Sequence, residues 1–558
     1  MVGMDFYVIT IPQVGANALS VSVASPASAA VPVRKLNEVG GEFPAWTSDG
    51  RHVMWSLANA LFTFDLNRAQ VVDDSLKADG RMKALLRADT TKKDSVARAD
   101  SITKADTTKQ DKPGYKPAER RITVSATRDK PSGVSVFRGA KAITMKGREI
   151  IENADIVVRN SRIEAIGARG SVQIPAGARV FDVAGKVVMP GMVDTHYHPQ
   201  WLTPGIHNTQ TWQYLATLAY GTTTTRDPQT SSTDFLSYGD RVETGDMVGP
   251  RIYTTGPGVF SQEPVKDLDH AKQILSRYSK YYDTKTLKMY MSGNRQQRQW
   301  IIMAAKELGI MPTTEGGLDQ KLNMTHGIDG YPGIEHTLPI TPKFKDVFEW
   351  YKGTGTYNSP TLVVEYGGPF GEGWFYQSED LVNDAKLRYF SHPIDLDGKI
   401  RRRGTGNSPG PAGFALREEY AMWQHAEDLA KTVAAGGRVG VGSHGQLQGL
   451  GMHWELWLIQ SGGLSTHDAL RAATIVGAEA IGMSTDVGSL EPGKMADFLV
   501  LDRDPLTNIR NSNSVGMVMM NGRLYDGSTL DEVYPRQRKL AARPWAYITP
   551  KAAAGIVP

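Results

Sequence analysis

The strongest constraint on the fold is an alternation of short apolar runs with helical patterns between residues 187 and 482. Each run has the length and apolar content of a buried strand. Among the helical stretches, Arg295–Leu308 places Trp300, Ala304 and Leu308 along one face. Eight successive βα units favour an α/β fold of the (β/α)8 TIM-barrel type over a doubly wound sheet. The predicted strands are Val187–Val193, Thr222–Arg226, Arg251–Thr255, Thr286–Met291, Ile310–Thr314, Gly333–Thr337, Tyr357–Val364 and Arg438–Gly442.

Two β-rich segments flank this predicted barrel, which we place at residues 187–485. Strand and turn patterns fill residues 122–186 before it and residues 486–545 after it. Neither segment can bury a convincing core alone, so we expect the two to form one composite β-sandwich beside the barrel. We assign residues 546–558 to a C-terminal tail outside these domains.

The N-terminal segment, residues 1–72, predicts a short β-blade of hairpins. Within Phe43–Leu66, three strand patterns are separated by turn and loop residues, among them Ser48-Asp49-Gly50. This stretch resembles one blade of a TolB-like propeller, and a hairpin appended to the next domain is an equal alternative. Because a single blade cannot bury both of its faces, we expect it to dock on the chain or on a partner, and we expect a homo-oligomer.

Residues 73–121 predict a polar linker between the blade and the sandwich. They are rich in Lys, Asp, Thr and Ser, and the sequence Ala-Asp-Thr-Thr-Lys occurs twice, at 88–92 and at 105–109. Such a segment buries too little apolar surface to offset its ordering entropy, so we expect it to be mobile or loosely helical.

Composition excludes several classes of function. A net charge of +4 over 558 residues is too small to predict nucleic acid as a partner, and the absence of cysteine excludes disulfides and thiolate chemistry. The chain lacks an uninterrupted apolar run long enough to cross a membrane, so we expect no membrane partner. The compartment stays open: we favour the cytoplasm, with export as the alternative if the small-residue segment Ser25–Ala30 marks a signal peptide.

A pair of histidines at the end of the first predicted barrel strand is the clearest sign of chemistry. His196 and His198 are two residues apart, so on a strand their side chains project to the same side. The carboxyl ends of barrel strands form the active-site mouth, and paired imidazoles there are ligands for a divalent metal.

Two stretches that bracket the predicted barrel resemble a known family. Val180–His198 is similar to the entry of the barrel in the amidohydrolase superfamily, and Val487–Leu501 is similar to its exit. The likeness covers about Ser135–Tyr525 and is strongest with the imidazolonepropionase-like and Xaa-Pro dipeptidase-like branch. It implies a metal-dependent hydrolase with one or two divalent ions, with zinc first and manganese or iron as alternatives.

The resemblance supplies further candidate residues on the later strands. Lys288 matches a strand-four lysine that is often carboxylated to bridge two metals, and the alternative is a lysine paired with a carboxylate. His336 matches the strand-six histidine and is a candidate ligand. Arg226 and Asp227 follow the second strand, where we expect a buried ion pair that stabilises the mouth.

Two positions depart from the family pattern. Glu315 stands where strand five should supply a histidine, and a carboxylate there changes the type of ligand without removing it. His444 stands where most of the superfamily have an aspartate that is both ligand and general base. We expect His444 at the metal centre, as ligand or as base, and we assign catalytic roles to His444 and Lys288.

The predicted activity is therefore metal-dependent hydrolysis of a small molecule. The branch implies cleavage of a carbon–nitrogen bond in an amide, a cyclic amide, a dipeptide or an N-acyl amino acid. A lactone or phosphotriester hydrolase on the same centre is the alternative. A second alternative is a non-catalytic scaffold protein, because the aspartate expected after strand eight is missing.

Overall fold

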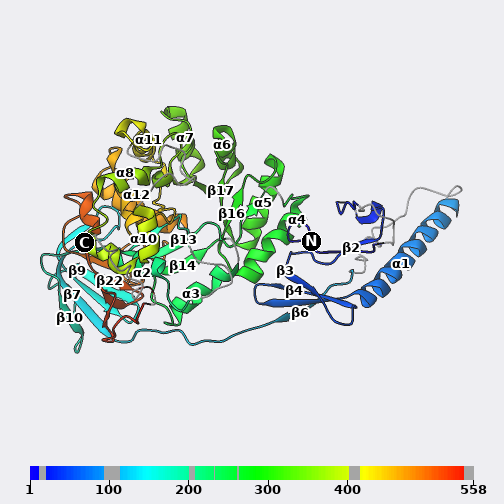
Figure 1. Ribbon diagram of the computed structural model, residues 1–558, viewed down its shortest axis with the longest axis horizontal. Helices are drawn as coiled ribbons and strands as arrows, with labels where there is room; N and C mark the ends of the chain where they lie inside the picture. Colours follow the sequence, from blue (N-terminus) through cyan, green and yellow to red (C-terminus); the bar gives the residue numbers. More distant parts are fainter. Residues whose placement is uncertain are drawn as a thin grey trace, which may run out of the picture. The chain divides into compact units, whose positions relative to one another are not determined.

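The computed structural model describes residues 1–11, 20–24, 26–93, 114–199, 208–230, 233–260, 263–400, 415–543 and 545 (Figure 1). The chain divides into two compact units, Met1–Ser125 and Ala126–Pro558. Among the described residues, we find no helix with the length and apolarity needed to cross a bilayer.

The first unit is built on a four-stranded antiparallel sheet of order β3-β4-β5-β6. One face carries the unit's core, in which the Trp55 ring stacks on Phe62 at 5.5 Å and meets Phe6 edge-on at 5.7 Å. A separate pair, β1 and β2, lies in the same unit. Its elements are β1 (Tyr7–Ile9), η1 (Pro26–Ser28), β2 (Val33–Lys35), β3 (Glu42–Trp46), β4 (His52–Leu57), β5 (Ala60–Asp65), α1 (Leu66–Lys93) and β6 (Ala118–Arg121).

Both ends of the predicted linker, residues 73–121, have regular secondary structure. Its first part continues helix α1, whose sequence is rich in Ala, Leu, Lys and Arg and holds no proline. Its last part is β6, which pairs with β5 and supplies an otherwise unpaired edge with a partner. Tyr115 packs edge-on against Phe64 at 5.0 Å just before this strand. Residues 94–113 lie outside the described part of the chain.

The second unit contains a nine-stranded sheet that joins its two β-rich segments. The strand order is β24-β23-β22-β21-β11-β7-β8-β9, and β10 also pairs with β7. Phe181 of β10 lies 6.1 Å from Tyr534 of β24, so strands that are distant in the sheet order face one another across a shared core. The strands are β7 (Val134–Ile143), β8 (Ile150–Arg159), β9 (Arg162–Ala168), β10 (Arg179–Asp182), β11 (Val187–Pro190), β21 (Phe498–Leu501), β22 (Val515–Met520), β23 (Arg523–Asp526) and β24 (Glu532–Tyr534).

The first predicted barrel strand is in fact two strands in different sheets. Val187 pairs with Leu501 in the nine-stranded sheet, whereas β12 (Met192–Asp194) pairs with a parallel strand. Gly191 lies at the break, where an added Cβ would meet the Thr223 side chain at 2.1 Å. Only glycine permits this close approach, so the chain changes sheets at Gly191.

Parallel strands with intervening helices make up the rest of the second unit. Three strands form one parallel sheet and six form another, and Thr195 N, just after β12, donates to Val441 O at 2.9 Å, just after β20. Figure 1 shows β16 and β17 side by side with α5 beside them. The strands are β12, β13 (Thr222–Asp227) and β14 (Arg251–Thr254) in the first sheet, and β15 (Val259–Phe260), β16 (Thr286–Tyr290), β17 (Met311–Glu315), β18 (Gly333–Glu335), β19 (Tyr357–Ser359) and β20 (Arg438–Val439) in the second.

The helices connect these strands in chain order. Helix α5 begins with a capping box between Asn294 and Gln297, ends at Gly309, and buries Ile301 and Ala304 against the strands. The α-helices are α2 (Trp212–Ala219), α3 (Leu236–Glu243), α4 (Leu268–Ser276), α5 (Arg295–Leu308), α6 (Gln320–Asp329), α7 (Lys345–Thr354), α8 (Gly371–Ser378), α9 (Ala385–Phe390), α10 (Pro393–Ile400), α11 (Met422–Ala434), α12 (Leu450–Ser461), α13 (Thr466–Ala472) and α14 (Ile475–Ala480). Short helical turns are η3 (Thr233–Phe235), η4 (Arg277–Tyr282), η5 (Leu362–Val364), η6 (Arg417–Glu419) and η7 (Ile509–Asn513).

One predicted strand is shorter than expected because its backbone turns. Strand β19 ends at Ser359, and Thr361 has a positive φ of 54°, after which η5 begins. The apolar run Leu362–Val364 is buried as a helical turn, which its apolar content alone does not distinguish from a strand.

Candidate metal centre

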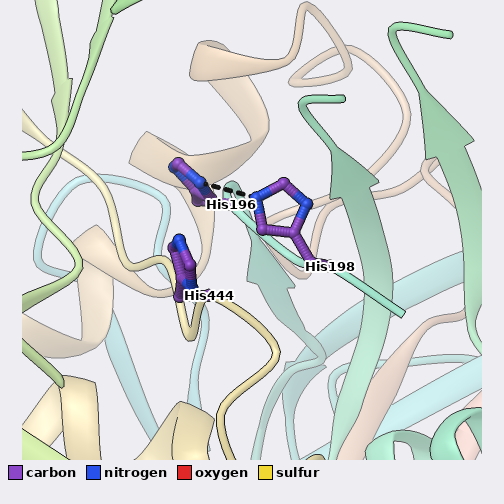
Figure 2. Close-up of side chains that lie close together, drawn as sticks. All are labelled: His196, His198 and His444. Carbon is purple, nitrogen blue, oxygen red and sulfur yellow. Dashed lines mark hydrogen bonds between the residues drawn. The ribbon is translucent and has the colours of Figure 1, made fainter. Parts of the chain in front are cut away.

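The strand-one histidines meet as the sequence predicts. His196 and His198 follow β12, and their Nε2 atoms lie 3.1 Å apart (Figure 2). His196 is fully buried, and one-fifth of the His198 side chain is exposed. The structure therefore brings two imidazole nitrogens together at the carboxyl end of a parallel strand.

His444 joins this pair from the segment that follows β20, the last parallel strand in the chain. Its backbone N–H donates to His196 O at 2.7 Å, and its ring lies 5.0 Å from that of His196 and 4.9 Å from that of His198. One ligand atom from each of the three side chains lies within 4.8 Å of the others. This spacing matches three ligands converging on one divalent ion.

His336 completes a group of four imidazoles. Its ring lies 4.8 Å from that of His196 and 5.4 Å from that of His444, and its Nδ1 lies 2.6 Å from Thr361 Oγ1. His336 and His444 both have positive φ, at 66° and 56°. Such conformations are costly for non-glycine residues and gather at functional sites, which fits a centre built from strand ends.

Lys288 and Glu315 form an ion pair beside His336. The Lys288 Nζ lies 2.5 Å from Glu315 Oε2, and His336 Nε2 lies 3.5 Å from the same oxygen. Burial raises the pKa of Glu315, but His336 and Lys288 outweigh that effect and hold its pKa well below the ordinary value of 4.5. The unmodified Lys288 side chain is thus paired with a carboxylate.

Two carboxylates that sequence reasoning did not assign to the site lie behind the strand-one histidines. Glu335 Oε2 is 2.7 Å from His196 Nδ1, off the line of a hydrogen bond, and Glu335 Oε1 accepts from Thr313 Oγ1 at 2.6 Å. Asp227 Oδ1 lies 3.0 Å from His198 Nδ1. Each strand-one imidazole therefore directs Nδ1 toward a carboxylate and Nε2 toward the other histidine.

The prediction of an ion pair between Arg226 and Asp227 is wrong, because each residue has another partner. Successive side chains on a strand point to opposite sides, so Arg226 and Asp227 face different neighbours. Arg226 donates to Glu335 Oε1 and to Thr195 O, both at 2.5 Å. Asp227 faces His198 instead. The signal that could have found Glu335 is its place next to His336, but strict alternation predicts that neighbours face apart, and the positive φ of His336 breaks that rule.

Asp194 fixes the ends of β12 and β20 to one another. It accepts from Ser443 Oγ at 2.5 Å, from Ser443 N at 3.1 Å and from His196 N at 3.2 Å. Burial raises the pKa of Asp194 to about 6, although these hydrogen bonds oppose the rise. The backbone that carries His196 and His444 is thus held by one buried carboxyl.

The imidazoles at the centre of the group are neutral near pH 7. Burial lowers the pKa of His196 and His444 well below 6.5, and the neighbouring histidines lower it further. A neutral imidazole is the form that binds a metal. His196 and His444 can therefore bind a metal ion without first losing a proton.

The part of the second unit that carries His444 also matches a known family. Residues 417–525 match the Amidohydrolase family. The chain thus contains an amidohydrolase domain and is a hydrolase that acts on carbon–nitrogen bonds. The matched residues include His444 among the site residues, whereas His196, His198, Lys288, Glu315 and His336 lie before them.

Two curated proteins are similar to this chain over about two thirds of its length. The 5-methylthioadenosine/S-adenosylhomocysteine deaminase of Symbiobacterium thermophilum is 25% identical over 414 residues, 66% of this chain and 85% of that protein. The imidazolonepropionase of Thermoplasma volcanium is 23% identical over 427 residues, 71% of this chain and 95% of that protein.

Solved structures share this fold. A Xaa-Pro dipeptidase with methionine bound in its active site has a TM-score of 0.54 and 18% identity, covering 71% of this chain and 100% of its own. Molinate hydrolase has a TM-score of 0.54 and 14% identity, covering 74% of this chain and 99% of its own. The second unit therefore has an α/β fold common to these enzymes.

Proposed function

We propose that this protein is a metal-dependent hydrolase that cleaves a carbon–nitrogen bond in an amide, cyclic amide, dipeptide or N-acyl amino acid. We also propose that its two parallel sheets make one TIM barrel with the metal centre at its mouth. The convergence of His196, His198 and His444 carries the proposal. The deaminase, imidazolonepropionase and Xaa-Pro dipeptidase among the similar proteins support the choice of bond.

The donor set fits a divalent metal, with zinc first and manganese or iron as alternatives. Zinc prefers imidazole ligands, and here three imidazoles lie within 4.8 Å of one another. Carboxylates lie behind two of them, as they commonly do behind zinc-binding histidines. When bound, such an ion supplies Lewis acidity toward a carbonyl and a nucleophile derived from water. A second ion would take His336 and Glu315, and would require the Lys288–Glu315 ion pair to open.

The remaining residues of the centre have distinct proposed roles. Glu315 is held ionised and is a weak base, so we propose that it positions the Lys288 ammonium. Lys288 can then donate to negative charge that develops on the substrate carbonyl oxygen. His444 is a ligand in this arrangement, and a base only if metal binding does not need it.

Metal content per chain tests the proposal. We expect one or two equivalents of a transition metal by elemental mass spectrometry after purification without chelators, and less than a tenth of this in the double variant His196→Ala/His198→Ala. His444→Ala separates the two roles of that residue, since loss of a ligand lowers the metal content and loss of a base leaves it unchanged. A wild-type protein that stays empty after incubation with zinc, manganese and bicarbonate would leave only the scaffold alternative.

A substrate panel tests the type of bond. We expect turnover of Xaa-Pro dipeptides or N-acyl amino acids by the metal-loaded protein and none by the His196→Ala/His198→Ala variant. Turnover confined to lactones or phosphotriesters would instead assign the alternative activity to the same centre.

A further inference from the structure

Four large apolar side chains are exposed in the loops that follow three neighbouring strands of the candidate site. Met291 is 45% exposed, Leu318 65%, Ile340 60% and Phe344 70%. We call these four residues the apolar rim. Soluble proteins seldom leave several large apolar side chains exposed together unless the surface binds something.

The apolar rim follows the site residues along the chain. Met291 comes three residues after Lys288, Leu318 three after Glu315, and Ile340 four after His336. The strands concerned, β16, β17 and β18, are parallel neighbours, so their loops leave the sheet at the same end.

Contacts join the loops that carry these residues. A Cβ on Gly317, next to Leu318, would lie 3.4 Å from the Met291 sulfur. The backbone N–H of Ile340 donates to the side chain of Gln320 at 3.3 Å. Phe344 follows in the same loop and precedes α7. The loops after β16, β17 and β18 therefore lie against one another.

Two half-buried tyrosines lie beside the charged centre. The Tyr290 ring is 5.5 Å from Lys288 Nζ, and the Tyr366 ring is 5.8 Å from that of His336. The centre is thus lined by charged groups and aromatic rings, and the apolar rim lies in the loops that follow its strands. A ligand that matches this arrangement has a polar group at one end and a large apolar group at the other.

We propose that the substrate carries a large apolar group, such as a medium-length acyl chain or an aromatic ring, and that the apolar rim binds this group. This inference rests on the proposed function and narrows it to amphipathic amides. Exposed apolar residues that lie away from the mouth, such as Ile328 near the end of α6, have no part in it.

The test compares N-acetylglycine with N-octanoylglycine in the metal-loaded full chain. Burial of even part of the six added methylenes should raise kcat/KM by about tenfold or more. The double variant Leu318→Asp/Phe344→Asp should lose this preference while it keeps its metal and its activity on N-acetylglycine. Ile328→Asp, an equally exposed apolar position in α6, is the matched control and should keep the preference.

Three results would overturn the inference. The first is a wild type that hydrolyses both compounds with equal kcat/KM, and the second is a preference that survives in Leu318→Asp/Phe344→Asp. The third is a dimer in light scattering that the same double variant converts to a monomer, because a second copy would then occupy the surface.

Absence of turnover would count against the proposed function and is separable from the inference. Calorimetric titration of N-octanoylglycine then measures the surface directly. Binding that weakens at least about tenfold in Leu318→Asp/Phe344→Asp, but not in Ile328→Asp, would support the apolar rim, and equal binding in all three proteins would refute it.

Discussion

At the scale of single residues, the backbone under two of the clustered histidines is as informative as their rings. His444 has a φ of 56° and His336 a φ of 66°, a region where a Cβ is unfavourable. The neighbouring elements must hold these conformations. Asp194 contributes to this by binding both Ser443 and His196.

We expect His444→Gly to be more stable than His444→Ala by about 1 kcal/mol, because alanine keeps the strained Cβ and glycine does not. Thermal unfolding of the two metal-free variants measures the difference. His453 lies inside α12, so there the order should reverse, with His453→Ala more stable than His453→Gly. The same order at both positions would contradict a strained His444.

Glu335 offers a second test at this scale, because its carboxylate faces His196 Nδ1 and also neutralises Arg226. We expect Glu335→Gln to fold and to bind zinc about 10- to 100-fold more weakly, measured by chelator competition. Glu335→Ala should also lose about 3–5 kcal/mol of stability, because it leaves Arg226 buried without its anion. Unchanged zinc affinity in Glu335→Gln would show that Glu335 serves only Arg226.

At the scale of elements, helix α12 contains a buried acid that links stability to pH. Both carboxylate oxygens of Glu455 accept backbone N–H groups of η5, from Leu362 at 2.8 Å and from Val363 at 2.9 Å. Burial raises the pKa of Glu455 to about 8, and the nearby carboxylates of Glu365 and Asp194 add to the rise. The folded state therefore binds this proton more tightly than the unfolded state.

Protonated Glu455 should contribute its full stabilisation below about pH 4.5. This contribution to the free energy of unfolding should fall as the pH rises toward 8. Glu455→Gln removes the titration, so its stability relative to wild type should improve by about 1.4 kcal/mol per pH unit across this range. Urea unfolding at pH 5, 6.5 and 8 measures the slope. The exposed Glu427→Gln in α11 is the control, and equal slopes in the two variants would remove Glu455 as the cause.

The sequence located most elements because their signals are local. The predicted apolar runs overlap β13, β14 and β16 to β20, although the predicted strand over β19 is too long. What it missed depends on backbone turns or on distant partners. The break at Gly191 is set by Thr223, which is more than thirty residues away.

The site residues also divide into those with a local sequence signal and those defined by distant partners. His196 and His198 were predicted together because strand alternation places them so, and they meet. Glu335 and Asp227 were missed as site residues because their roles come from the histidines that they face, His196 and His198. Glu335 is next to His336 in the chain, but strand alternation predicts that the two face apart, and the positive φ of His336 is not visible in the sequence.

At the scale of the whole molecule, the division at residue 125 makes the two units separable in principle. The first unit has its own core around Trp55, and all six candidate site residues lie in the second unit. We expect a chain of residues 126–558 to fold and to bind the same equivalents of metal as the full chain. Circular dichroism and elemental mass spectrometry check this, and a folded but metal-free fragment would show that Met1–Ser125 supports the centre.

The pairing of β11 with β21 also has a consequence for how this protein is made. Strand β11 leaves the ribosome roughly 300 residues before its partner, which at 5–20 residues per second is a wait of about 15–60 s. During that time the apolar edge of Val187–Pro190 is open to wrong partners. The newborn chain is thus most vulnerable to aggregation after its first β-rich segment has emerged, and protection by a chaperone matters most in that interval.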